Sequence, residues 1–218
     1  MAEFINRADA GRRLGAALSG FRETHPIVLG LPRGGVPVAA EVAAALDAPL
    51  DVLVVRKLGL PFQPEVAMGA IGEGGVEVVN EGLIARAAVT SIQLEEVEAR
   101  ERATLEARVA QLRPDGARLD LTDRTAIIVD DGIATGATST AACAVARRLG
   151  ARRVIVAAPV GGPDAVQLVQ GADDVVCLLQ PAGFQAVGAY YDDFRSTRDA
   201  DVVALLDADR RRREADHG

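Results

Sequence analysis

The sequence contains little histidine, cysteine or lysine, and the first two shortages argue against metal and redox sites. Its 218 residues include two histidines and two cysteines. Cys143 and Cys177 lie among apolar neighbours without the spacing of a metal site or a CxxC motif, so we expect buried, reduced thiols. With His25 and His217 as the only histidines, a histidine-rich transition-metal site is not expected.

Long apolar runs and excess positive charge are also missing. No run reaches the ~18 apolar residues of a membrane span, and the N-terminus lacks a charged segment followed by an apolar one, as a secretory signal has. We therefore expect a soluble cytoplasmic protein with no membrane partner. The net charge of -7 argues against a nucleic-acid partner bound through its phosphates. Lys57 is the only lysine in the chain.

Apolar or β-branched runs alternate with segments of helical spacing, which predicts an α/β fold with a parallel sheet. The length of 218 residues and the 49% of hydrophobic residues suit a single domain over residues 1–218. The five expected strands are Ile27–Leu31, Leu50–Val55, Ala126–Val129, Val154–Ala158 and Val175–Leu179.

Three further segments are expected to lie outside this sheet. Thr90 to Gln93 spells a capping box and predicts a long, charged, mostly solvated helix over about 91–113. Residues 58–75 are rich in glycine and proline and predict a mobile loop or a hairpin. The last residues, Arg210–Gly218, predict a frayed charged tail.

The stretch IIVDDGIATGATST (127–140) places two carboxylates, Asp130 and Asp131, at the end of an expected strand. Open α/β sheets bind ligands at this edge. Backbone N–H groups, the hydroxyls of Thr135 and Thr138, and the start of the next helix would form a cradle for a phosphate. Because ribose hydroxyls can donate to ionised acceptors, the combination fits a sugar phosphate. The alternative is a strand-to-helix turn with capping aspartates.

A second loop, GLPRGGVPVA (30–39), leaves the first expected strand. Its arginine and glycines would offer a guanidinium and exposed N–H groups near the same edge. Arg56 and Lys57 end the second expected strand there, where a pyrophosphate would need cationic contacts. The alternatives are ordinary loop chemistry for the glycine turn and a solvated strand end for the two cations.

The strand, DD, GIATGAT and helix resemble the phosphoribosyl diphosphate (PRPP) motif of the type I phosphoribosyltransferases. The order of elements is compatible with that family over about residues 1–195. The resemblance implies a five-stranded parallel sheet flanked by helices, with a small hood formed by about residues 180–200 and, as a further candidate, the N-terminus. It also implies that Asp130 and Asp131 bind the ribose 2′- and 3′-hydroxyls.

The same resemblance assigns the remaining contacts with PRPP. Mg²⁺ would be held mainly by substrate oxygens, since this ion needs few protein ligands. The implied catalytic residues are Asp130, Asp131, Arg33 and Lys57. The residues implied to enclose the 5′-phosphate are Ile133, Ala134, Thr135, Gly136, Ala137 and Thr138. Those implied to contact pyrophosphate are Arg33, Gly34, Gly35, Arg56 and Lys57.

The segment AVGAYYDDF (186–194) resembles the hood of the hypoxanthine-guanine phosphoribosyltransferases. It implies base contacts from Val187, Phe184 and Tyr190, and a carboxylate near the metal from Asp192. Alanine replaces the aromatic residue expected before the VG step, so the acceptor base stays open. The alternative for the aromatic cluster is packing of a C-terminal hairpin.

The function implied by the resemblance is Mg²⁺-dependent transfer of phosphoribosyl from PRPP to a small heterocyclic base, with release of pyrophosphate. A homodimer is compatible with it. The alternative is a PRPP- or nucleotide-sensing regulatory protein with the same fold. Because the chain has no helix-turn-helix or basic patch, such a regulator would need a protein or RNA partner. A PRPP-using enzyme with an unfamiliar acceptor, or a phosphatase acting on sugar phosphates, also stays open.

Overall fold

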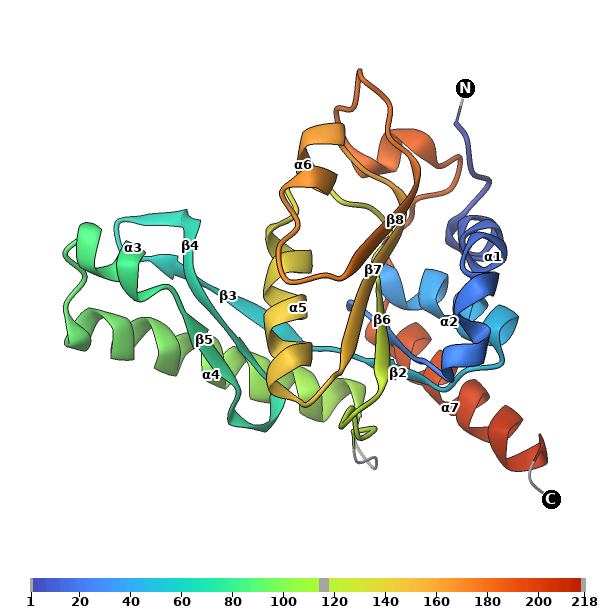
Figure 1. Cartoon of the computed structure of the whole chain (residues 1–218), viewed down its shortest axis with the longest axis horizontal. Helices are drawn as coiled ribbons and strands as arrows, with labels where there is room; N and C mark the ends of the chain where they lie inside the picture. Colours follow the sequence, from blue (N-terminus) through green and yellow to red (C-terminus); the bar gives the residue numbers. More distant parts are fainter. Residues whose placement is uncertain (1, 114–117, 217–218) are drawn as a thin grey trace.

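The computed structural model describes residues 2–113 and 118–216 and shows an α/β body with a projecting arm (Figure 1). The body contains a five-stranded parallel sheet in the order β2-β1-β6-β7-β8, which confirms the predicted sheet. Its strands are β1 (Ile27–Gly30), β2 (Leu50–Val52), β6 (Thr125–Val129), β7 (Arg153–Val160) and β8 (Asp174–Leu179).

Both faces of the sheet are covered, as the nearly continuous apolar strands require. In β6, Ile127 and Val129 join the core beneath α1, α2 and α7, whereas Ala126 and Ile128 join the core beneath α5. Figure 1 shows α1 and α2 on one side of the sheet and α5 on the other. The bounds of these helices are Arg7–Ala17 for α1, Gly35–Leu46 for α2, Ala137–Arg148 for α5 and Asp199–Asp216 for α7. Short helices lie at Ser19–Thr24 (η1), Pro163–Gln167 (α6) and Val187–Tyr190 (η3).

The two cysteines are free thiols, in line with the expected reduced state. Cys143 lies fully buried in the core beneath α5. Cys177 is half-buried, and its thiol donates to the Leu179 carbonyl. Burial raises the pKa of Cys143 to about 12 and that of Cys177 to about 11. Both thiols are therefore unreactive at neutral pH.

Residues 55–112 form the arm, and the hairpin is confirmed for the segment that we expected to be either a loop or a hairpin. Strands β3 (Val55–Leu60), β4 (Gln63–Gly72) and β5 (Glu77–Val79) make a separate antiparallel sheet in that order. A short 3-10 turn, η2 (Glu73–Gly75), joins β4 to β5, and α3 (Glu81–Arg86) follows β5. A mobile loop is the wrong description, because Met68 and Ile71 in β4 are fully buried.

The long helix α4 (Ser91–Leu112) completes the arm, and its predicted capping box is present. The helix is mostly solvated, as expected, and Val97, Leu105 and Leu112 are buried in the same core as β4. Hydrophobic spacing along one face was hidden among the many charges of this segment.

Arg113, directly after α4, fastens the arm to the body. Its guanidinium donates to Asp51 (3.1 Å) and Glu73 (2.6 Å) and to the Val52 carbonyl (3.1 Å). The three charged side chains are at most 6% exposed. A buried cation shared by two carboxylates therefore joins β2, the end of β4 and the end of α4.

The predicted frayed tail is wrong over residues 210–216, which continue α7; residues 217–218 lie outside the described part of the chain. Val202 and Leu206 of α7 are buried. The buried Asp209 carboxylate accepts from the Leu50 N–H (3.0 Å) and from Arg212 (2.7 Å). These tertiary contacts stabilise a helix in a charged segment for which the local sequence pattern does not predict one. Among the described residues, no helix combines the length and apolar character needed to cross a bilayer.

Candidate active site

The two loops singled out in the sequence meet at the carboxyl edge of the parallel sheet. One loop joins β1 to α2 and the other joins β6 to α5, and β1 and β6 are neighbouring strands. Gly34 lies against the Asp131 carboxylate so closely that a Cβ there would overlap with it. Gly35 lies against the backbone of Asp130. The glycines of the first loop thus let the acidic pair of the second approach the backbone.

The loop after the acidic pair has the features of an anion cradle. Ile133 is anchored to the end of β7, since its N–H donates to the Val160 carbonyl (2.9 Å) and its carbonyl accepts from Gly162 (3.0 Å). Gly136 adopts a left-handed conformation (φ 74°) and caps α5. Within residues 118–216, the N–H groups of Ala134, Thr135 and Gly136 donate to no protein acceptor. Together with the amino end of α5 they form a site suited to a phosphate.

Asp131 is held by a residue that sequence reasoning missed, Arg7 in the first turn of α1. Both Nε and Nη2 of Arg7 lie 2.8 Å from one carboxylate oxygen of Asp131. The two side chains are 12% and 16% exposed. Burial raises the pKa of Asp131, and the charge of Arg7 opposes that rise. No local motif marks Arg7, because the pair forms only when α1 packs against α2 and β7.

Asp130 is the more deeply buried carboxylate of the pair. Its Oδ1 accepts from the Asp131 N–H (2.9 Å). Burial, followed by the adjacent Asp131 charge, raises the pKa of Asp130 to about 7. Burial thus raises the pKa of both carboxyls of the pair, and the charge of Arg7 opposes this rise.

The N-terminal segment around Phe4 and the segment 190–192 lie together next to this edge of the sheet. The N–H of Phe4 donates to the Tyr190 carbonyl (2.9 Å), and the N–H of Asp192 donates to the Phe4 carbonyl (2.9 Å). The Tyr191 hydroxyl donates to the backbone carbonyl of Asp131 (2.7 Å). The N-terminal strand-like segment and the predicted hood segment thus lie together beside the acidic pair.

The structure separates the aromatic residues of this region by role. Tyr191 is buried against Phe4 and packs the region, but the hairpin of the alternative interpretation is not formed, since residues 187–190 are the 3-10 turn η3. Phe184 and Tyr190 are partly exposed and stack on each other, with ring centroids 5.9 Å apart and planes 5° apart. Val187 lies against Gly132, next to Asp131. Asp192 is exposed.

Arg56 and Lys57 do not end a strand of the parallel sheet, so that expectation is wrong. Strand β2 ends at Val52, and the two cations lie in β3 of the arm. They line a cleft of about 800 Å³ together with Pro32, the neighbour of Arg33, and Thr138 of the cradle. The cleft thus brings the arm cations beside the ends of both loops. Asp130 and Asp131 are not part of its lining among the described residues.

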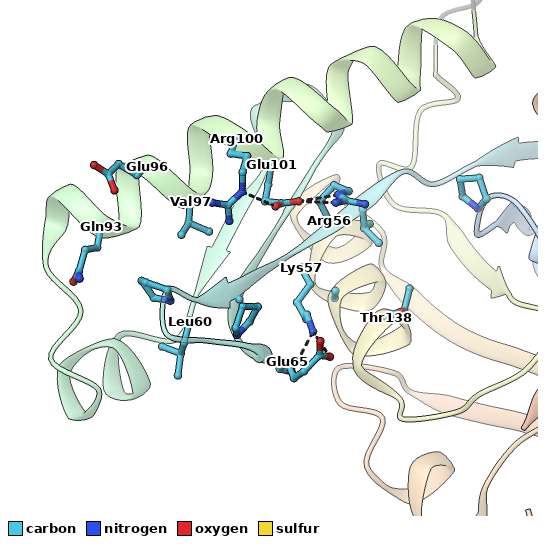
Figure 2. Close-up of a pocket in the computed structure, with 16 residues that line it drawn as sticks. Arg56, Lys57, Leu60, Glu65, Gln93, Glu96, Val97, Arg100, Glu101 and Thr138 are labelled. Atoms are coloured by element: carbon cyan, nitrogen blue, oxygen red, sulfur yellow. Dashed lines mark hydrogen bonds and ion pairs between the residues drawn. The ribbon is translucent and has the colours of Figure 1, made fainter. Parts of the chain in front are cut away.

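Carboxylates of the arm neutralise both cations (Figure 2). Nε and Nη2 of Arg56 donate to one oxygen of Glu101, at 3.0 and 2.7 Å. The Lys57 ammonium donates to the Glu65 carbonyl (3.1 Å) and lies 3.6 Å from its carboxylate. Arg33, by contrast, is exposed on its loop, and among the described residues its side chain has no ion-pair partner.

The donor set of this edge offers few protein ligands to a metal ion. Among the described residues, no three histidine, cysteine or acidic side chains gather as a metal site. The Asp131 carboxylate is engaged by Arg7, and Asp192 of the hood segment is exposed. The set suits a hard cation that takes most of its ligands from a phosphorylated substrate and from water.

Comparisons with known proteins point to one family. The family model described as "Phosphoribosyl transferase domain" matches residues 5–193. A curated protein from two strains of Mycobacterium tuberculosis, provisionally named a phosphoribosyl transferase, is 53% identical over 205 residues, covering 94% of this chain and 46% of that protein. The chain thus spans about half the length of this relative. The crystal structure of TT1426 from Thermus thermophilus matches with a TM-score of 0.87 and 45% identity, covering 94% of this chain and 97% of that one.

Proposed function

Because this chain belongs to the phosphoribosyl transferase domain family, we propose that it transfers the 5-phosphoribosyl group of PRPP to a nitrogenous base and releases pyrophosphate. One observation carries the proposal: a carboxylate pair, a glycine loop and an N–H cradle meet at one sheet edge. A strand-to-helix turn with capping aspartates would not need Gly34 packed against the Asp131 carboxylate.

The proposed substrate pose follows from these groups. The 5′-phosphate binds the loop from Ile133 to Thr138, where unpaired N–H groups face no competing protein acceptor. The ribose hydroxyls donate to the Asp130 carboxylate and to the Asp131 oxygen that Arg7 does not contact. Displacing pyrophosphate at C1′ builds positive charge on the ribose ring. The buried negative pair then stabilises the transition state more than the ground state.

The leaving pyrophosphate is assigned to the glycine loop and the arm cleft. The Arg33 side chain and the Gly34 N–H would contact it from the body, while Arg56 and Lys57 would do so from the arm. The Gly35 N–H already donates to the Leu31 carbonyl (3.0 Å). Mg²⁺, when bound with the substrate, would neutralise charge on the diphosphate oxygens. The protein would contribute at most Asp192, and the other ligands would come from substrate oxygens and water.

The acceptor base is assigned to the space beside the hood, near Val187, Phe184 and Tyr190. The stacked ring pair offers an aromatic surface but no charged group that would select one base. The proposal is tested by incubating the protein with PRPP, Mg²⁺ and a panel of purines, pyrimidines and related heterocycles, and measuring pyrophosphate release. Release that depends on one base supports the transferase; no release with any base, from protein that binds PRPP, contradicts it.

A sensor that binds PRPP or a nucleotide is the second candidate, and one observation favours it. The arm cations Arg56 and Lys57 are already paired with Glu101 and Glu65, so a ligand must displace carboxylates to reach them. A sensor of the 5′-phosphate end alone would leave these pairs intact. Two predictions separate the candidates.

Arg33 should provide the preference for a diphosphate. The wild type is expected to bind PRPP with Mg²⁺ at least tenfold more tightly than ribose 5-phosphate, since a charged hydrogen bond contributes about 1.5–3 kcal/mol. Arg33→Ala should erase most of that preference while ribose 5-phosphate affinity stays the same. Isothermal titration calorimetry measures both, with Arg22→Ala as a distant control. Equal wild-type affinities for the two ligands would favour the sensor.

Lys57 should be shielded when the diphosphate binds. As the only lysine, and 32% exposed, it is the single side chain open to an amine-specific reagent once the N-terminal amine is blocked. PRPP with Mg²⁺ is expected to protect it, and ribose 5-phosphate alone to protect it poorly. Lys57→Ala should lower turnover more than ribose 5-phosphate binding, because charge on the leaving group grows toward the transition state. Lys57→Arg should retain partial activity. Full labelling at saturating PRPP would remove Lys57 from the pyrophosphate site.

A further inference from the structure

Arg7 of α1 contacts two other segments at the acidic pair. Besides its two contacts with Asp131, its Nη1 donates to the Arg195 carbonyl (2.8 Å). Its guanidinium lies 3.9 Å above the centre of the Phe194 ring. Gly34 leaves room for this side chain, because a Cβ there would come within 3.3 Å of Arg7 Nε. A single side chain thus joins α1 to the acidic loop and to the C-terminal segment.

This geometry leaves Arg7 little freedom and no surface role. A planar guanidinium can use its edge for a carboxylate and a carbonyl while its face lies on an aromatic ring. An arginine that served only to pair a surface carboxylate would stay mostly exposed, as Arg12 does on the same helix at 59%. The contacts of Arg7 use all three of its nitrogens and fix one oxygen of Asp131, so the other oxygen is presented in a defined direction.

Resting on the proposed function, we infer that Arg7 is a positioning residue: it orients the Asp131 carboxylate for the ribose diol and clamps the C-terminal segment beside it. Arg7 does not touch the reacting atoms in this assignment. It acts on the substrate through Asp131. Because it also contacts Phe194 and Arg195, the position of the hood segment depends on the same arginine.

The charged and titratable groups around the pair determine the pH behaviour of this arrangement. Asp131 faces Arg7 from α1 and its neighbour Asp130, and Tyr191 approaches from the hood. On the C-terminal segment, Arg195 is paired with Asp193. Arg7 is therefore the cation that directly balances the pair. Removing its charge should make the second ionisation of the pair harder and move it to higher pH.

The test compares Arg7→Gln, Arg7→Lys and the wild type, with Arg12→Gln as a control that loses the same charge from the same helix without touching Asp131. The first readout is the titration of the carboxyl carbons of ¹³C-labelled aspartates by NMR, which needs no ligand. Arg7→Gln is expected to raise the midpoint of the pair by about one pH unit or more, the usual effect of losing an adjacent opposite charge. Arg7→Lys should keep the titration close to that of the wild type.

The second readout is ribose 5-phosphate binding at pH 8. Arg7→Gln is expected to weaken it about tenfold or more, and Arg7→Lys to weaken it less but measurably, since an ammonium supplies charge without the two-point geometry. If Arg7→Gln does not fold, the Lys variant decides: wild-type affinity in Arg7→Lys overturns the inference. An unshifted titration in folded Arg7→Gln also overturns it. If no variant and no wild type binds the ligand while the titration shifts, the proposed function fails and the pairing of Arg7 with the acidic pair stands.

Discussion

Replacing Asp131 with asparagine should weaken PRPP binding roughly ten- to a hundredfold, and the double variant with Asp130→Asn should weaken it further. Each lost charge-assisted hydrogen bond is worth about 1.5–3 kcal/mol. The amide keeps the size of the side chain, so the change tests charge at unchanged packing. Calorimetry with Mg²⁺ measures the loss, and Asp47→Asn, at the C-terminal end of α2 beside Arg212, is the matched control. Unchanged affinity in a folded double variant would remove this loop from the substrate site.

The single Asp130→Asn variant should show opposite effects on binding and stability. Because burial raises the pKa of Asp130 to about 7, the wild-type carboxyl is mostly neutral at pH 6 and mostly charged at pH 8. Its loss should therefore affect PRPP binding little at pH 6 and strongly at pH 8.

Stability should change in the other direction. A carboxyl whose pKa is raised in the folded state stabilises fully only below its unfolded value of about 4, and that contribution is lost as pH rises through about 7. Asparagine carries no buried charge at pH 8. The ligand-free variant should therefore have a free energy of unfolding roughly 1 to 3 kcal/mol larger than that of the wild type at this pH, and a higher melting temperature. Equal melting temperatures at pH 8 would contradict the buried ionisation.

Arg113→Met should lower the free energy of unfolding by about 3–5 kcal/mol, the usual loss when one partner of a buried ion pair is removed. Methionine fills much of the same volume, but Asp51 and Glu73 would remain buried without a cation. Burial raises the pKa of Asp51, and the charge of Arg113 opposes that rise. Without Arg113, protonation should relieve the repulsion between the two carboxylates, so the loss should be smaller at pH 5 than at pH 8.

Urea unfolding at the two pH values measures this effect, with Arg102→Met as the control. Arg102 pairs with Glu77 at the surface of the same arm, at 34% exposure, where an ion pair contributes about 0–1 kcal/mol. If the free energy of unfolding falls by the same small amount in the two variants, the buried cluster does not stabilise the attachment of the arm.

The sequence was most informative where function depends on neighbouring residues. Asp130, Asp131 and the cradle follow one strand directly, so their position at the sheet edge could be predicted from local pattern. The five strands were found for the same reason, since buried parallel strands read as apolar runs.

The errors arise where one contact joins distant segments. Arg7 is 124 residues from Asp131, and no spacing rule connects them. Arg56 and Lys57 were assigned to the wrong sheet because the apolar run continues through Val54 and Val55, across the point where the chain leaves the body for the arm. The end of α7 was missed because it depends on Asp209 reaching the backbone of β2, which is a tertiary effect.

The pairing of Phe4 with Tyr191 and of Arg7 with Arg195 has a consequence for the order in which the protein matures during synthesis. Phe4 and Arg7 are made about 190 residues before the partners with which they pair. Because domains generally fold as units, the acidic pair gains its complete surroundings only after residues 191–195 have left the ribosome. A ligand that stabilises the folded chain by binding there can therefore act only after that point of synthesis.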